Sequence, residues 1–159
     1  MKVIDTNEYL SVIRELVQQG KEVSLIVTGN SMEPFLIHQR DTICFKNLES
    51  PIKVGDMVFY QRTNGKFVMH RVYKVKSDEL YMLGDAQRTV EGPIKESQVF
   101  AVVTKVKRNG KWLTPGSFWW EFFARFWIRI VPIRRIVLPL CTRRKHYETR
   151  RRKKIKATL

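Results

Sequence analysis

The chain has 159 residues, enough for one compact domain with an appendage, and its 43% hydrophobic content excludes disorder throughout. A net charge of +15 would suggest a nucleic-acid partner if the charge were spread over a folded surface. It is concentrated near the end instead, because residues 118–159 hold 13 of the 30 Lys and Arg residues and only two acidic residues. The two cysteines lie in regions of different character, which argues against a disulfide framework.

The first 22 residues predict one amphipathic helix. Apolar residues recur at helical spacing between positions 10 and 17, Thr6 can cap the start, and Gly20 can end the segment. We therefore expect a helix over residues 6–19. Charged residues recur every few positions, so no apolar stretch here resembles a signal peptide.

Residues 23–117 change to the short alternating runs that are typical of strands. The runs, rich in Val, Ile, Phe and Tyr, are VSLIVTG, DTICFK, MVFYQR, FVMHRVYKVK, LYMLGD and QVFAVVTKVK. Two joints between them are Asn-Gly pairs, at 64–65 and 109–110, which suit tight hairpin turns. The sequence thus predicts a mainly β fold, with an antiparallel β domain over 23–117 behind the N-terminal helix.

Residues 118–140 predict an aromatic, amphipathic segment. In residues 118–131 the only charged positions are Glu121, Arg125 and Arg129, four apart, which in a helix leaves a narrow polar stripe and a broad aromatic face. Fourteen helical residues reach about 21 Å, short of the roughly 30 Å hydrocarbon core. We therefore expect the segment to lie along a membrane surface. Packing against the β domain and a single span are the alternatives.

Residues 141–159 form a basic tail that is too charged to fold by itself. Anionic lipid would attract such charges, so the expected partner is an anionic membrane surface, at the cytoplasmic face of a bacterial membrane. No motif supports a specific nucleic-acid partner.

The run LIVTGNSMEPFL, residues 25–36, carries the candidate nucleophile. Ser31 follows a strand end, with Gly29 before it and Pro34 after it, so a sharp turn can present its hydroxyl with amides free to face an oxyanion. A turn without a catalytic role also uses Gly, Asn and Ser. A hydroxyl is a weak nucleophile, so the catalytic interpretation requires a base nearby.

His70 is the candidate base. It is the one histidine inside a predicted strand, on the side of Val68 and Val72, where a polar group needs a partner. A carboxylate usually holds such an imidazole in one tautomer, and Asp85 ends the next strand, although Asp after Gly is also common in turns. Because the ordinary pKa of histidine is about 6.5, we expect a reaction that uses His70 as its base to slow on acidification through that range.

The motifs resemble those of a known family. GNSMEPFL is similar to the nucleophile box of signal peptidases, VGDMVFY and VMHRV to the next two boxes, and LGDAQ to the acid box. A histidine in the base box resembles the Ser-His type of signal peptidase I-like serine peptidases (S24/S26 type), found in the endoplasmic reticulum and in spore formers. The resemblance implies that Ser31 is the nucleophile, His70 the base and Asp85 the orienting acid. It implies an oxyanion or cleft site with Gly29, Met32, Pro34 and the Ser31 amide, and no metal or organic cofactor.

The chain departs from the family pattern in three respects. Ala86 replaces an Asn of the acid box, and Glu91 and Gly92 follow where the pattern has a second Asp. A polar amphipathic helix takes the place of the family's membrane-spanning helix.

The predicted function is a serine endopeptidase that cleaves a signal or leader peptide by acyl-enzyme chemistry at a membrane. Its partner would be a peptide or protein substrate. The alternative is a non-catalytic membrane-bound adaptor that retains the fold. A self-cleaving repressor fits less well, because it uses a Lys base, and Lys74 and Lys76 are out of register.

Overall fold

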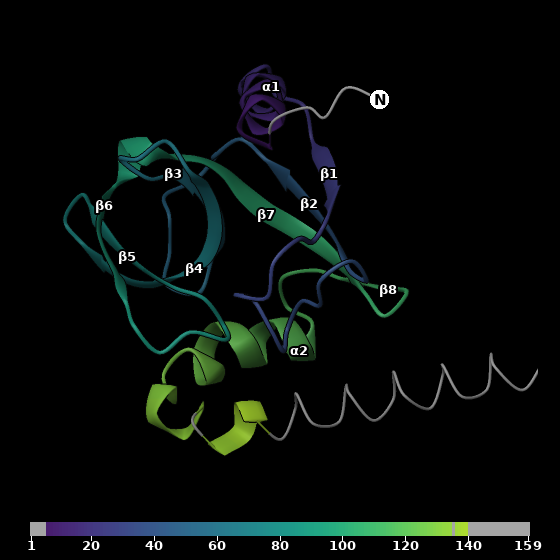
Figure 1. Ribbon diagram of the computed structural model, residues 1–159, viewed down its shortest axis with the longest axis vertical. Coiled ribbons are helices and arrows are strands. Elements are labelled where there is room, and N and C mark those ends of the chain that lie inside the picture. The colour runs from purple at the N-terminus through teal and green to yellow at the C-terminus, as the bar shows by residue number, and fades with distance from the viewer. Residues whose placement is uncertain (1–5, 135, 140–159) are drawn as a thin grey trace, which may run out of the picture.

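The computed structural model describes residues 6–134 and 136–139. In this part of the chain an eight-stranded sheet follows one helix and precedes a group of short helical turns (Figure 1). The helix and the strands are α1 (Thr6–Gln18), β1 (Val23–Ile26), β2 (Thr42–Lys46), β3 (Met57–Gln61), β4 (Phe67–Lys76), β5 (Glu79–Leu83), β6 (Glu91–Lys95), β7 (Val99–Arg108) and β8 (Lys111–Leu113). The helical turns that follow the sheet are α2 (Phe118–Glu121), η2 (Phe122–Trp127) and η3 (Val131–Ile133), and one further turn, η1 (Glu96–Gln98), joins β6 to β7.

The strands follow the order β1-β2-β7-β3-β4-β5-β6, β8 pairs with β7, and each pairing is antiparallel. The predicted mainly β, antiparallel fold is therefore confirmed. Turns containing the two Asn-Gly pairs join β3 to β4 and β7 to β8, and Asn109 and Gly110 have φ angles of 49° and 82°. The prediction missed β8, which has three residues, and β6, whose Pro93 is tolerated because β6 lies at the end of the sheet order.

Side chains alternate between two hydrophobic clusters on opposite faces of the sheet. The first cluster includes Ile13, Val17, Phe35, Phe59, Trp120 and Trp127. The second includes Val58, Tyr60, Val72, Leu80 and Ile94. Helix α1 thus packs on the first cluster through its apolar face, as its periodicity predicted.

Residues 118–134, here called the C-terminal segment, lie at the opposite end of the molecule from α1, at the bottom of the view in Figure 1. The segment is a short α-helix that continues as a turn of π-helix, and Trp120, Phe123 and Trp127 are buried in the first cluster. Phe118 and Phe126 remain 74% and 65% exposed, so core packing accounts for only one face of the segment. Within the described residues, helices are too short or too polar to cross a membrane. The basic tail, 141–159, lies outside those residues.

Candidate active site

Ser31 lies in a tight turn that begins three residues after β1. Met32, Phe35 and Leu36 anchor the turn in the core, with 0–2% exposure, and the Leu36 amide donates to the Met32 carbonyl at 2.9 Å. Gly29 has a φ of +84°, a conformation that suits glycine. Ser31 itself is half-buried, and neither its hydroxyl nor its amide hydrogen-bonds to any group in the described part of the chain. Both groups are therefore available to a substrate.

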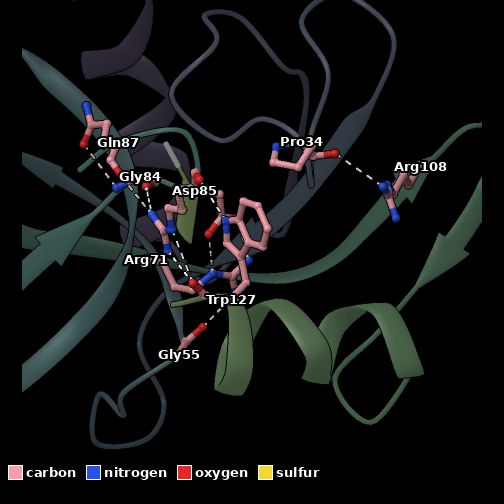
Figure 2. A network of polar contacts seen from close by, with 9 residues as sticks. Pro34, Gly55, Arg71, Gly84, Asp85, Gln87, Arg108 and Trp127 are labelled. Carbon is pink, nitrogen blue, oxygen red and sulfur yellow. Dashed lines mark hydrogen bonds and ion pairs between the residues drawn. The ribbon is translucent and has the colours of Figure 1, made fainter. Parts of the chain in front are cut away.

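A cavity of about 200 Å³ lies beside Ser31. Its walls are mostly apolar and include Leu10, Ile26, Gly29, Met32, Phe59 and Met69. Two of the predicted cleft residues, Gly29 and Met32, thus line this cavity. The third, Pro34, directs its carbonyl to the Arg108 guanidinium, which donates at 3.3 Å (Figure 2).

The loop of residues 84–87 packs directly against the main chain of Ser31. The Ala86 amide donates to the Ser31 carbonyl at 2.8 Å. A Cβ atom added to Gly84 would lie 2.5 Å from that same carbonyl oxygen, closer than packing allows. Glycine at position 84 is therefore required for the loop and the serine turn to approach this closely.

His70 is buried in β4 and contacts a tyrosine on the neighbouring strand. Its Nδ1 lies 3.0 Å from the Tyr60 hydroxyl, which in turn donates to Glu91 Oε2 at 2.8 Å. Because the single Tyr60 proton is directed to Glu91, the hydroxyl oxygen is the acceptor for His70. The Nδ1 atom of the neutral imidazole therefore carries the proton, and Nε2 keeps the lone pair that a base needs.

Burial favours the neutral form of His70, while the two charges near it, on Glu91 and Arg62, act in opposite directions. Arg62 donates to both carboxylate oxygens of Glu91, at 2.6 and 2.5 Å, and these bonds lower the pKa of Glu91. Burial raises the pKa of Tyr60, so that Tyr60 stays a donor. Burial lowers the pKa of His70 to about 4, although Glu91, 3.8 Å from Nδ1, acts in the opposite direction. The fall in activity expected near pH 6.5 is therefore moved to lower pH.

Asp85 pairs with Arg71 in the structure. Its two carboxylate oxygens accept from the Arg71 guanidinium at 3.1 and 3.0 Å, and both side chains are fully buried (Figure 2). A third guanidinium bond reaches the Gly55 carbonyl at 2.9 Å. The carboxylate beside His70 belongs instead to Glu91, so the geometry differs from the expectation that Asp85 orients the base.

The described residues thus bring the predicted site together in part. The Ser31 main chain contacts the loop that carries Asp85, and Val68 and Met69, which precede His70, line the cavity beside Ser31. No hydrogen bond joins Ser31 to His70 in the part of the chain that the structure covers. The same residues contain no cluster of three His, Cys, Asp or Glu side chains that could hold a metal ion.

A scan against protein families matches residues 1–106 to the family described as Peptidase S24-like. The chain belongs to the Peptidase S24-like family. The match covers two thirds of the chain and includes Ser31, His70, Asp85 and Glu91, whereas the C-terminal segment lies beyond it. Membership supports a serine peptidase-type fold and, at the level of the family, a peptidase or related protein. None of the curated proteins matches the chain.

Proposed function

We propose that this member of the Peptidase S24-like family is a serine endopeptidase that cleaves a signal or leader peptide at a membrane, as its resemblance to Ser-His signal peptidases suggests. The observation that carries the proposal is Ser31, whose hydroxyl and amide are both without a partner among the described residues, at the edge of an apolar cavity. A nucleophile and an oxyanion donor need that arrangement.

In the proposed reaction His70 Nε2 takes the Ser31 hydroxyl proton as the oxygen attacks the scissile carbonyl carbon. The Ser31 amide donates to the resulting oxyanion. The peptide C–N bond then breaks, the imidazolium gives its proton to the leaving nitrogen, and an acyl-enzyme remains. Water then attacks the ester carbonyl carbon while His70 Nε2 takes a proton from the water. His70 gives this proton to the Ser31 oxygen as the ester bond breaks, which restores the hydroxyl. In the described residues the 84–87 loop that contacts Ser31 lies on the Arg71 side of β4, whereas His70 lies on the Tyr60 side. The proposed reaction therefore requires substrate binding to bring the Ser31 hydroxyl and His70 Nε2 together.

Glu91 acts in this mechanism through Tyr60. The proton on His70 Nδ1 points to the Tyr60 oxygen, and Tyr60 in turn donates to Glu91. These two hydrogen bonds fix the tautomer of the His70 imidazole, and the negative charge of Glu91 stabilises the imidazolium. Asp85 supports the site by a different route, because its loop contacts the Ser31 main chain.

The cavity favours a substrate with an apolar side chain near the cleaved bond. Apolar cavities of about 150 Å³ hold a molecule the size of benzene, so a cavity of about 200 Å³ takes an aliphatic or aromatic side chain. Signal and leader peptides supply such residues. The exposed aromatic residues of the C-terminal segment support a site of action at a membrane surface, which we propose is the cytoplasmic face of a bacterial membrane.

The test is cleavage of a random peptide library by the purified full chain, with products identified by mass spectrometry. We expect cleavage at bonds that share a nearby apolar residue, and no cleavage by Ser31→Ala or His70→Ala, since nucleophile and base act as a unit. Glu91→Gln should reduce the rate without abolishing it. Ser50→Ala, at an exposed serine, is the matched control and should retain full activity.

Two outcomes would contradict the proposal. Undiminished cleavage by a folded Ser31→Ala variant would remove Ser31 from the mechanism. Absence of cleavage by the wild-type chain, across the library and in the presence of vesicles, would favour the non-catalytic adaptor.

A further inference from the structure

The C-terminal segment lies outside the family match, yet its side chains bind the loop that supports Ser31. The Trp127 indole Nε1 donates to the Asp85 carbonyl at 2.8 Å (Figure 2). The Arg134 guanidinium donates to the carbonyls of Gly84 and Gln87, both at 2.9 Å. Three carbonyls of the 84–87 loop are thus satisfied by two side chains of the C-terminal segment.

These two side chains are themselves rigidly held. Trp127 is 4% exposed and Arg134 is fully buried. Arg134 also donates to the Trp127 carbonyl, at 2.8 and 3.3 Å, and its guanidinium lies 5.4 Å from the centre of the Trp127 ring. A buried guanidinium is costly unless its donors are satisfied, and here they are directed to main-chain carbonyls of the loop and of Trp127.

The loop transmits this constraint to the nucleophile. The Ala86 amide binds the Ser31 carbonyl, and Gly84 leaves no room for a Cβ atom against the same oxygen. A displacement of the loop therefore displaces the Ser31 main chain. Misplacement of a reacting group by about 1 Å can cost on the order of a hundredfold in rate.

We propose that Trp127 and Arg134 are positioning residues, which hold the 84–87 loop and through it the Ser31 main chain. The proposal rests on the proposed peptidase activity for its catalytic consequence. It makes the C-terminal segment, which the family match does not include, part of the active-site support.

The test compares Trp127→Phe and Arg134→Lys with Ile128→Val in the full chain. Trp127→Phe removes the indole donor and keeps an aromatic ring, and Arg134→Lys keeps the charge and loses the planar fork. Ile128 is 1% exposed in the same segment, so its variant controls for a general loss of packing. The measurements are kcat and KM on a cleaved peptide and the exchange rate of the Ala86 amide by NMR.

We expect Ala86 exchange at least tenfold faster and kcat at least tenfold lower in both loop-contact variants, with KM within twofold. Ile128→Val should leave both quantities within twofold of wild type. Unchanged Ala86 exchange in folded variants would overturn the proposal, as would normal kcat despite faster exchange or an equal loss of kcat in Ile128→Val. If the wild-type chain cleaves nothing, the proposed function fails, and the exchange rates alone decide whether the segment holds the loop.

Discussion

At the scale of single residues, the imidazole of His70 loses nearly all contact with solvent on folding, and this loss governs its protonation. Burial disfavours the charged form, so the pKa of His70 falls to about 4 from an ordinary value of about 6.5. Below about pH 6.5 the unfolded chain binds a proton at this position, whereas the folded chain does so only near pH 4. Between these two pH values His70 must release its proton when the chain folds. The free energy of unfolding therefore falls as the pH falls through this range.

We predict that wild-type protein loses up to about 3 kcal/mol more unfolding free energy between pH 7 and pH 4 than His70→Gln does, because glutamine cannot be protonated. Urea unfolding at several pH values measures the difference. Protonation of carboxylates with lowered pKa values, such as Asp41 and Glu91, also destabilises the protein in acid. Both proteins contain these carboxylates, so the difference between them reports on His70. Parallel pH dependence in the two proteins would show that His70 keeps an ordinary pKa.

Ser31 and His70 could be singled out from the sequence because each lies in a short local motif. Glu91 and Tyr60 could not, since their contact with His70 depends on strand pairing between distant segments, and on a register shift between β5 and β6. Glu91 did carry a signal, as the acid that follows the LGDAQ motif. Asp85 pairs with Arg71 and not with His70. These two neighbours in β4 point to opposite faces of the sheet, and the loop that carries Asp85 lies on the Arg71 side.

At the scale of elements, the short alternating runs predicted most of the strands. Successive side chains of a strand point to opposite faces of the sheet, so apolar residues recur at every second position in the sequence. The C-terminal segment was harder to predict. A helical pattern shows which residues share a face, but not whether that face meets a membrane or the protein's own core. The structure divides its apolar residues, with Trp120, Phe123 and Trp127 inside and Phe118 and Phe126 outside.

This division predicts that a chain ending at Gly116 is strongly destabilised. It lacks the buried residues Trp120, Phe123, Trp127, Ile128 and Arg134. Each large aromatic residue lost from a core costs about 3–5 kcal/mol, while whole domains are stable by about 5–15 kcal/mol. We expect near-ultraviolet circular dichroism and the cooperative urea transition to be lost or greatly weakened. A chain ending at Pro139 is the control and should keep both, and equal urea midpoints for the two would contradict the packing described here.

At the scale of the whole molecule, charge and exposed aromatic residues gather at the same end of the chain. Phe118, Phe122 and Phe126 form a ladder of stacked rings, with successive centroids 6.4 Å apart, and Trp119 beside it is 47% exposed. Arg125, whose side chain is 73% exposed, lies on the same segment. The basic tail that follows in the sequence would add about 1 kcal/mol of attraction to anionic lipid for each charge near the surface.

We therefore predict that the full chain floats with vesicles containing anionic phosphatidylglycerol, and that a variant combining Phe118→Ser, Trp119→Ser and Phe126→Ser binds them severalfold more weakly. Raising the salt concentration should weaken binding by the wild type without abolishing it, because charge attraction is screened and aromatic burial is not. A matched control combines Tyr9→Ser and Val12→Ser, at exposed apolar positions of α1 at the opposite end of the molecule (Figure 1), and should bind as the wild type does. Equal binding by both variants would mean that the aromatic ladder does not contact lipid. Complete loss of wild-type binding at high salt would assign the attraction to the basic tail alone, and the proposed aromatic docking would be wrong.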